Sequence, residues 1–139
     1  MDVALESTLH WLTTVVVQPA IMTLQAWSRR AEVTCDRAAL LAVRDLDKTL
    51  QALVAIELGL DKGAAFSAED YLKSVPDVKR GIGRYAELFR SHPQLPKRVE
   101  ALRLFAGSAM YAQATGGDPT GKPSLTDVDK QVASLISVL

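Results

Sequence analysis

The sequence predicts an all-α protein of five to seven helices, with a long first helix and essentially no strand. Three observations predict this class: apolar residues recur at spacings of three and four, no convincing run alternates with period two, and capping residues separate the periodic segments. The 139 residues are 48% hydrophobic and 23% charged, which is typical of one folded domain with a real core. The single cysteine excludes an internal disulfide framework and a cysteine-rich zinc module.

The first helix is predicted around an uncharged stretch, residues 7–28, that is long enough to cross a bilayer. Its threonines and Pro19 make it a poor span, and Pro19 is expected to kink a helix. Trp11 and Trp27 near its two ends, followed by a basic pair, are typical of interfacial anchors. Two interpretations stay open, a buried or interfacial helix and a membrane-associated span. Acidic residues occupy the place of a basic n-region, so we expect no cleavable signal peptide and a membrane-associated or cytoplasmic protein.

Capping residues predict the bounds of the next helices. Asp45 predicts the start of a second helix and Gly59 its end, and Pro96 fits the first turn of a later one. Shorter helices are predicted from Ser67 and around Tyr85. The expected apolar faces are Trp27, Ala31, Thr34, Cys35, Ala38, Leu41 and Ala42 in the first helix, Leu46, Leu50, Leu53, Val54 and Leu58 in the second, and Val99, Leu102, Leu104, Phe105 and Met110 after Pro96.

The end of the chain predicts a linker and one last helix. The segment that runs from residue 115 to residue 124 holds three glycines and two prolines, which is typical of a linker. Thr126 with Asp129 is then predicted to cap a final helix. Its expected apolar residues are Val128, Val132, Leu135, Ile136 and Leu139.

Charge is balanced, with 16 basic and 16 acidic side chains, which argues against a general nucleic-acid binder. It is unevenly distributed, because residues 1–70 carry a net charge of −4 and residues 71–139 a net charge of +4. The basic excess lies mainly within residues 73–103, and it is either a solvated face or a surface for anionic lipid or an acidic partner. We therefore expect no nucleic-acid partner and consider a membrane surface as a partner of residues 7–28.

Glu32 and Asp36 are the first candidates for chemistry. They lie four residues apart, so they share one face of the predicted helix, one turn apart. This spacing suits a metal ligand followed by a carboxylate that orients another ligand through a hydrogen bond. Such pairs are also common on solvated helix faces, and the spacing alone leaves both interpretations open.

The residues around this pair resemble a known family. Residues 27–45 resemble the stretch that holds the third zinc ligand in metallopeptidase family forty-eight, which includes the heat-shock protease HtpX and the CAAX prenyl proteases. The family pattern is Glu-x-x-Ala-Asp-Arg, and Cys35 stands where alanine is usual, so we expect a small packing residue there. Residues 85–98 resemble the family's His-Pro segment, in which Arg98 follows His92 by six positions. The resemblance extends over roughly two-thirds of the chain, from about residue 20 to residue 112.

The resemblance implies a role for each matching residue. Glu32 matches the glutamate that binds zinc, and Asp36 matches the carboxylate that steadies a zinc-bound histidine. His92 and Arg98 match the pair near the active site that polarises or orients the scissile peptide group. The implied mechanism is peptide-bond hydrolysis by a zinc-activated water, with a glutamate as general base.

The sequence departs from the family pattern at the catalytic motif. No His-Glu-x-x-His motif is present, since His10 and His92 are 82 positions apart. We therefore expect one zinc ligand here and the other two outside this chain. The expected organisation is the C-terminal part of a metallopeptidase-like helical domain over residues 1–115, a linker over residues 116–124 and a C-terminal helix over residues 125–139.

Two functions follow from these observations. The first is a zinc metalloendopeptidase family protein that acts on a polypeptide substrate, present as a C-terminal portion that is inactive alone. The alternative is a non-catalytic helical module that binds a partner protein or a membrane surface through residues 7–28 and the basic segment 73–103.

Overall fold

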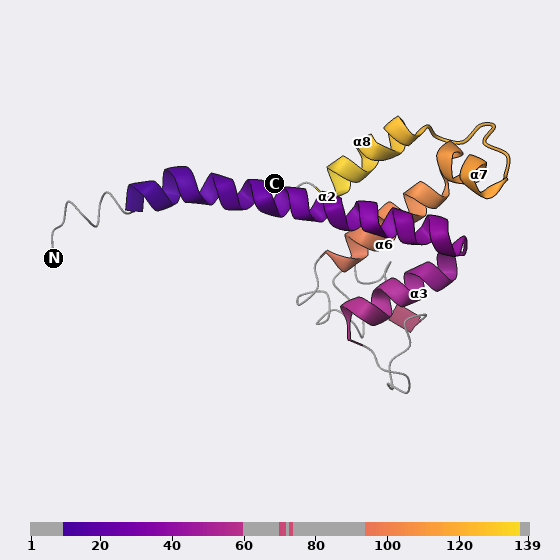
Figure 1. Ribbon diagram of the computed structural model, residues 1–139, viewed down its shortest axis with the longest axis horizontal. Coiled ribbons are helices and arrows are strands. Elements are labelled where there is room, and N and C mark those ends of the chain that lie inside the picture. The colour runs from indigo at the N-terminus through magenta and orange to yellow at the C-terminus, as the bar shows by residue number, and fades with distance from the viewer. Residues whose placement is uncertain (1–9, 60–69, 72, 74–93, 137–139) are drawn as a thin grey trace.

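The computed structural model describes residues 10–59, 70, 71, 73 and 94–136. These residues are all-α and contain no strand, which confirms the predicted fold class, and five α-helices are labelled among them (Figure 1). The elements are the π-helical η1 (Thr13–Val17), α2 (Gln18–Val43), α3 (Leu46–Glu57), α6 (Leu95–Ala106), α7 (Ala109–Thr115) and α8 (Leu125–Ile136). Of the helix predicted from Ser67, only residues 70, 71 and 73 are described, and these are helical, whereas the helix predicted around Tyr85, and also His92, lie outside the described residues.

The long first helix passes through Pro19 without a break. The chain is helical from His10 to Val43, and Pro19 is the second residue of α2, directly after the π-helical turns of η1. Proline has no N–H to donate, and its ring crowds the carbonyl group four residues earlier. The wider π-helical turns leave room for this ring, so the helix continues through Pro19, and the kink expected there stays a prediction.

The first half of this helix projects past the other helices (Figure 1). Large hydrophobic side chains are exposed all along it, and Trp27 is 68% and Trp11 57% exposed. None of the described helices is long and apolar enough to cross a membrane. Residues 10–25 of this stretch are exposed rather than buried in the structure, and an interfacial position stays a prediction.

The core is built around α6, which packs against α2, α3 and α8. Leu95, Val99 and Phe105 of α6 are fully buried and form the centre of one continuous apolar cluster. Burial of side chains of this size stabilises the fold by about 1.5–3 kcal/mol each. The other buried hydrophobic residues of the cluster are Val33 and Leu40 of α2, Leu50, Leu53 and Val54 of α3, Tyr71, Ala101 and Leu102, and Val128, Val132 and Ile136 of α8.

The buried face of α2 differs from the predicted one. Val33, Asp36 and Leu40 are buried, whereas Trp27 and Cys35 of the predicted face are exposed. The expectation that Cys35 is a packing residue is therefore wrong. The predicted face is turned toward solvent because the helix is rotated so that Asp36 faces α6 and pairs with an arginine there.

Several caps follow the prediction. Asp45 accepts a hydrogen bond from the Lys48 backbone N–H at 3.1 Å and begins α3, as expected. Gly59 follows the end of α3 with a left-handed φ of 61°, which only glycine adopts without steric cost. Pro96 lies in the first turn of α6, where its missing N–H costs no hydrogen bond.

Two helix boundaries differ from the prediction. The helix that begins near Pro96 ends at Gly107, and Ser108 caps the separate helix α7 by accepting from the Tyr111 N–H at 3.1 Å. Met110 therefore lies on α7 and is 41% exposed. Ser124, rather than the expected Thr126, caps α8, because its hydroxyl accepts from the Asp127 N–H at 3.2 Å.

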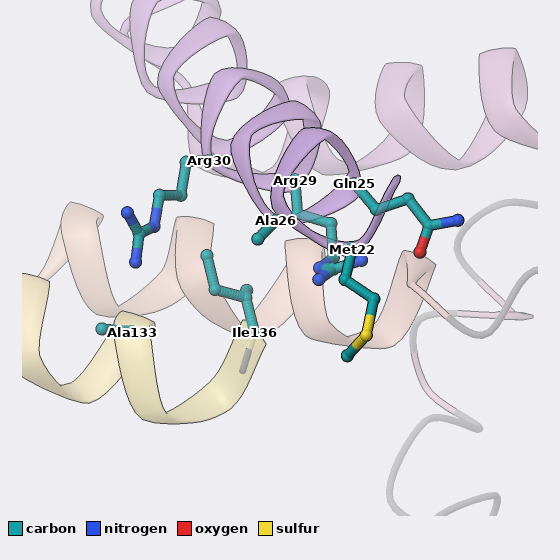
Figure 2. A pocket seen from close by; sticks show the side chains of 7 residues that line it. All are labelled: Met22, Gln25, Ala26, Arg29, Arg30, Ala133 and Ile136. Carbon is teal, nitrogen blue, oxygen red and sulfur yellow. The ribbon is translucent and has the colours of Figure 1, made fainter. Parts of the chain in front are cut away.

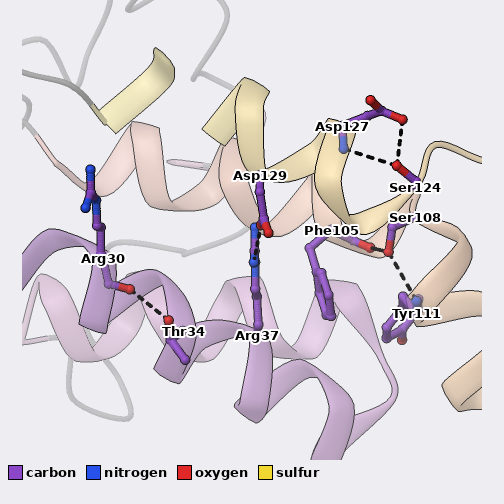
Figure 3. Close-up of polar contacts among 9 residues, drawn as sticks. All are labelled: Arg30, Thr34, Arg37, Phe105, Ser108, Tyr111, Ser124, Asp127 and Asp129. Carbon is purple, nitrogen blue, oxygen red and sulfur yellow. Dashed lines mark hydrogen bonds and ion pairs between the residues drawn. The ribbon is translucent and has the colours of Figure 1, made fainter. Parts of the chain in front are cut away.

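Arg37 ties α8 to the long helix (Figure 3). Its Nη1 donates to Asp129 Oδ1 of α8 at 2.7 Å. Its guanidinium carbon lies 5.1 Å from the centre of the Phe105 ring, which is a cation–π distance. One arginine of α2 therefore contacts both α6 and α8, and the last helix is held against the same core as the others.

Candidate carboxylate–arginine site

Glu32 and Asp36 lie one turn apart on α2, as their spacing predicts. The Asp36 side chain is 10% exposed and the Glu32 side chain 42% exposed. A carboxylate that is as buried as Asp36 needs a charged partner, because water no longer solvates it. The two carboxylates therefore differ in solvent exposure, and only Glu32 is open to solvent.

Arg98 is the partner of Asp36 and comes from the second turn of α6. Its Nε donates to Asp36 Oδ2 at 2.9 Å and its Nη2 to Asp36 Oδ1 at 2.8 Å, which is a bidentate pair. Its Nη1 donates to Glu57 Oε2 at 2.9 Å and lies 4.0 Å from Glu32 Oε2. One guanidinium therefore holds carboxylates of α2 and α3 together, at the point where both helices pack against α6.

Glu57 is a member of the site that the sequence analysis missed. It lies in the last turn of α3, and its side chain is 30% exposed. An acidic residue at this position opposes the negative end of the helix dipole, so it costs stability unless a cation lies nearby. An acidic residue at the end of the predicted helix could therefore have indicated a nearby cation, and in the structure that cation is Arg98.

Charge and burial act together in this cluster. When Glu32, Asp36 and Glu57 are ionised, three carboxylates surround one guanidinium and leave a net negative charge. Hydrogen bonds to Asp36 raise the pKa of Arg98 further above its ordinary value against the opposing effect of burial, and the charges of the carboxylates add to the rise. Burial raises the pKa of the Tyr71 hydroxyl well above its ordinary value, and the charge of Glu57 raises it further. Arg98 therefore stays charged and Tyr71 stays neutral throughout the physiological range.

Within residues 10–59 and 94–136, the donor groups fit a zinc ion only in part. Asp36 and Glu57 both accept hydrogen bonds from Arg98, and Glu32 alone makes no contact with it shorter than 4.0 Å. No group of three His, Cys, Asp or Glu side chains in the described part of the chain could hold a metal ion. A catalytic zinc takes three protein ligands, so the described residues can supply one of them, Glu32, and do not form the site by themselves.

The two histidines do not change this result. His10 lies 22 residues before Glu32 on a continuous helix, which places it about 33 Å away, too far to share a metal ion. It is exposed at the start of the described helix. His92 lies outside the described residues, so its predicted place beside Arg98 stays a prediction.

The class of protein follows from a comparison with protein families. The family model described as Peptidase family M48 matches residues 4–106, so the chain belongs to this zinc-dependent family. The match includes Glu32, Asp36, Glu57 and Arg98, which are the four members of the cluster. The resemblance that residues 27–45 and 85–98 suggested is thus confirmed at the level of the family. None of the curated proteins and none of the solved structures matches the chain.

Proposed function

We propose that this chain carries the carboxylate part of a zinc metalloendopeptidase centre, in which Glu32 binds the metal. One observation carries the proposal: of the three carboxylates around Arg98, Glu32 alone is both open to solvent and free of a direct hydrogen bond to the guanidinium. A zinc held by Glu32 would supply a Lewis acid that polarises the substrate carbonyl and lowers the pKa of a water bound to it. In this chain, Glu32 is the residue that would bind such a zinc.

Asp36 and Arg98 are the positioning residues of this centre. The bidentate pair joins α2 to α6 one turn after Glu32 and so limits movement of the helix that carries the ligand. Each Asp36 oxygen accepts one hydrogen bond from Arg98 and keeps a second lone pair, which can accept from the ring N–H of a zinc-bound histidine. His92 keeps the role that the family resemblance implies, orientation of the scissile peptide group.

In this proposal the remaining parts of the centre come from outside these 139 residues. Two histidine ligands and a glutamate base are required, and no His-Glu-x-x-His motif is present here. We therefore expect the 139 residues alone to be inactive, and a longer or second chain to complete the site. A polypeptide is the expected substrate.

The test uses the native species that contains these residues, isolated from its source cells with an antibody against residues 115–139. We expect a mass above 15.1 kDa, one zinc per chain, and peptide hydrolysis that a chelator stops. Glu32→Gln should remove both the zinc and the activity, whereas Glu100→Gln, the same change on α6 away from the cluster, should keep both. Full activity or full zinc content in Glu32→Gln would sink the assignment, and so would a native species without zinc.

A second candidate function rests on the exposed half of the long helix. Large apolar side chains from Trp11 to Trp27 are exposed along it, and many exposed apolar side chains on one segment are typical of an interaction site. A non-catalytic module would use this surface to bind a partner protein or a membrane. Sedimentation with anionic vesicles that decreases at high salt and is unchanged by a chelator supports it, and the absence of any vesicle or partner binding contradicts it.

A further inference from the structure

A groove between α2 and α8 is separate from the carboxylate–arginine site. Two adjoining cavities of about 240 and 330 Å³ form it and share Arg30, Ala133 and Ile136 as lining residues. Their lining on α2 runs from Met22 to Arg37, which extends over about 22 Å of helix. Together they reach the size range of sites for small ligands, which begins near 300 Å³.

The groove combines an apolar wall with a basic edge (Figure 2). Met22, Ala26 and Ile136 supply apolar surface, and the guanidinium groups of Arg29 and Arg30 project from α2 toward α8. Neither arginine forms an ion pair with any residue that the structure describes. Among the residues that the structure describes, no carboxylate therefore pairs with either of these two positive charges beside the apolar surface.

Arg29 provides the second observation. Its Nε is buried from solvent and has no hydrogen-bond partner. A buried donor without an acceptor is destabilising, so such an atom is rare in a folded protein unless a ligand or water accepts its hydrogen bond. Arg37 at the far end of the groove also has a buried, unpaired Nε, but its Nη1 is already bound to Asp129. An anionic ligand would therefore supply the missing hydrogen-bond acceptor to Arg29 Nε.

We infer that this groove binds a single-chain anionic amphiphile, with its carboxylate or phosphate head on Arg29 and Arg30 and its acyl chain along Ile136. Charge complementarity selects the head, because the unpaired guanidinium groups match an oxyanion. The helices that line the groove favour an acyl chain as the tail, because their backbone groups are already hydrogen-bonded within each helix. The Thr34 hydroxyl in the groove is also occupied, since it donates to the Arg30 carbonyl at 2.9 Å.

A peptide fits this groove less well than an acyl chain. A peptide brings backbone N–H and C=O groups that need partners when they are buried. Apart from the charged groups and Thr34, the lining offers the Gln25 amide as its polar side chain. An acyl chain needs no partners, so it can fill the apolar part of the groove without leaving polar groups unsatisfied.

The test is calorimetric titration of the full chain with dodecanoate and with dodecyl phosphate, each below its micelle concentration. We expect saturable binding of one molecule per chain. Inorganic phosphate, which lacks the chain, and dodecyl maltoside, which lacks the charge, should bind at least tenfold more weakly. A head-group preference between the two anions identifies the lipid class.

Matched variants separate this groove from general adsorption. Arg29→Gln should weaken binding about tenfold or more, whereas Arg103→Gln, the same loss of charge at an exposed position of α6, should leave it unchanged. Ala133→Trp fills the groove and keeps every charge, so it should abolish binding. The proposal fails if Arg103→Gln weakens binding as much as Arg29→Gln, if Ala133→Trp binds normally, or if the neutral detergent binds equally well. Circular dichroism of each variant shows whether it is folded.

Discussion

Replacement of Arg98 by methionine tests whether this residue joins α2, α3 and α6. Methionine keeps an unbranched apolar stem of similar length to the arginine methylenes and removes the guanidinium. Asp36 then loses two hydrogen bonds of 2.8 and 2.9 Å, and Glu57 loses one of 2.9 Å. We expect a large loss of stability, because the Asp36 side chain is 10% exposed and cannot be solvated where it lies.

The size of the loss follows from burial. Breaking a buried ion pair costs about 3–5 kcal/mol, since it leaves one charge without compensation. Glu57 is 30% exposed and can turn toward water, so its contact contributes only about 0–1 kcal/mol. Partial solvent access to Arg98 reduces the first figure. We therefore expect Arg98→Met to lower the free energy of unfolding by about 3 kcal/mol, mostly through Asp36.

Urea unfolding followed by circular dichroism at 222 nm measures this change. Arg103→Met, an exposed position on the same helix, should stay within about 0.5 kcal/mol of the parent protein. Asp36→Asn combined with Arg98→Met should cost less than the two single changes added together, because the pair is coupled. If Arg98→Met unfolds the chain, Arg98→Lys keeps the charge and should give a smaller, measurable loss. Additive single changes, or equal effects of Arg98→Met and Arg103→Met, would refute the reasoning.

Two further predictions concern a helix cap and a buried hydroxyl. Ser124→Ala should destabilise the protein by about 1 kcal/mol, with Thr126→Ala nearly neutral, in the same urea assay. It should also let the pKa of Asp127, which the Ser124 hydrogen bond lowers, return toward 3.8 in a carboxyl NMR titration. Because the pKa of Tyr71 is raised in the folded state, the Tyr71 hydroxyl contributes fully to the free energy of unfolding below pH 10.0. This contribution decreases as the pH rises above 10.0, since the tyrosine then ionises in the unfolded state but not in the folded state. Unfolding measured between pH 9 and pH 12 should therefore depend less on pH in Tyr71→Phe than in Tyr111→Phe, and equal dependence would contradict this.

Local sequence signals predicted the start and the end of α3 and the start of α6. Asp45, Gly59 and Pro96 act within one turn of the backbone, so their effects do not depend on the rest of the fold. The errors arose where two local signals compete. Ser124 and Thr126 are both acceptable caps, and the structure uses the earlier one.

The sequence predicted most residues of the candidate site but not the hydrogen bonds between them. The spacing of Glu32 and Asp36 and the family resemblance named three of the four members of the cluster. Their pairing with Arg98, and the presence of Glu57, depend on contacts across 62 and 41 residues of sequence. Local periodicity carries no information about such contacts, because it describes one helix at a time.

The sequence by itself determined that this protein is all-α, that it belongs to a zinc peptidase family, and where α3 and α6 begin. The fold class and the helix starts follow from spacing and capping, which act over a few residues, whereas the family follows from the resemblance of residues 27–45 and 85–98 and from the family match over residues 4–106. Only the tertiary structure decided which face of α2 is buried. Small residues favoured one face, but Asp36 must be buried against the arginine of α6 that compensates its charge, and this requirement rotates the helix so that Cys35 faces solvent.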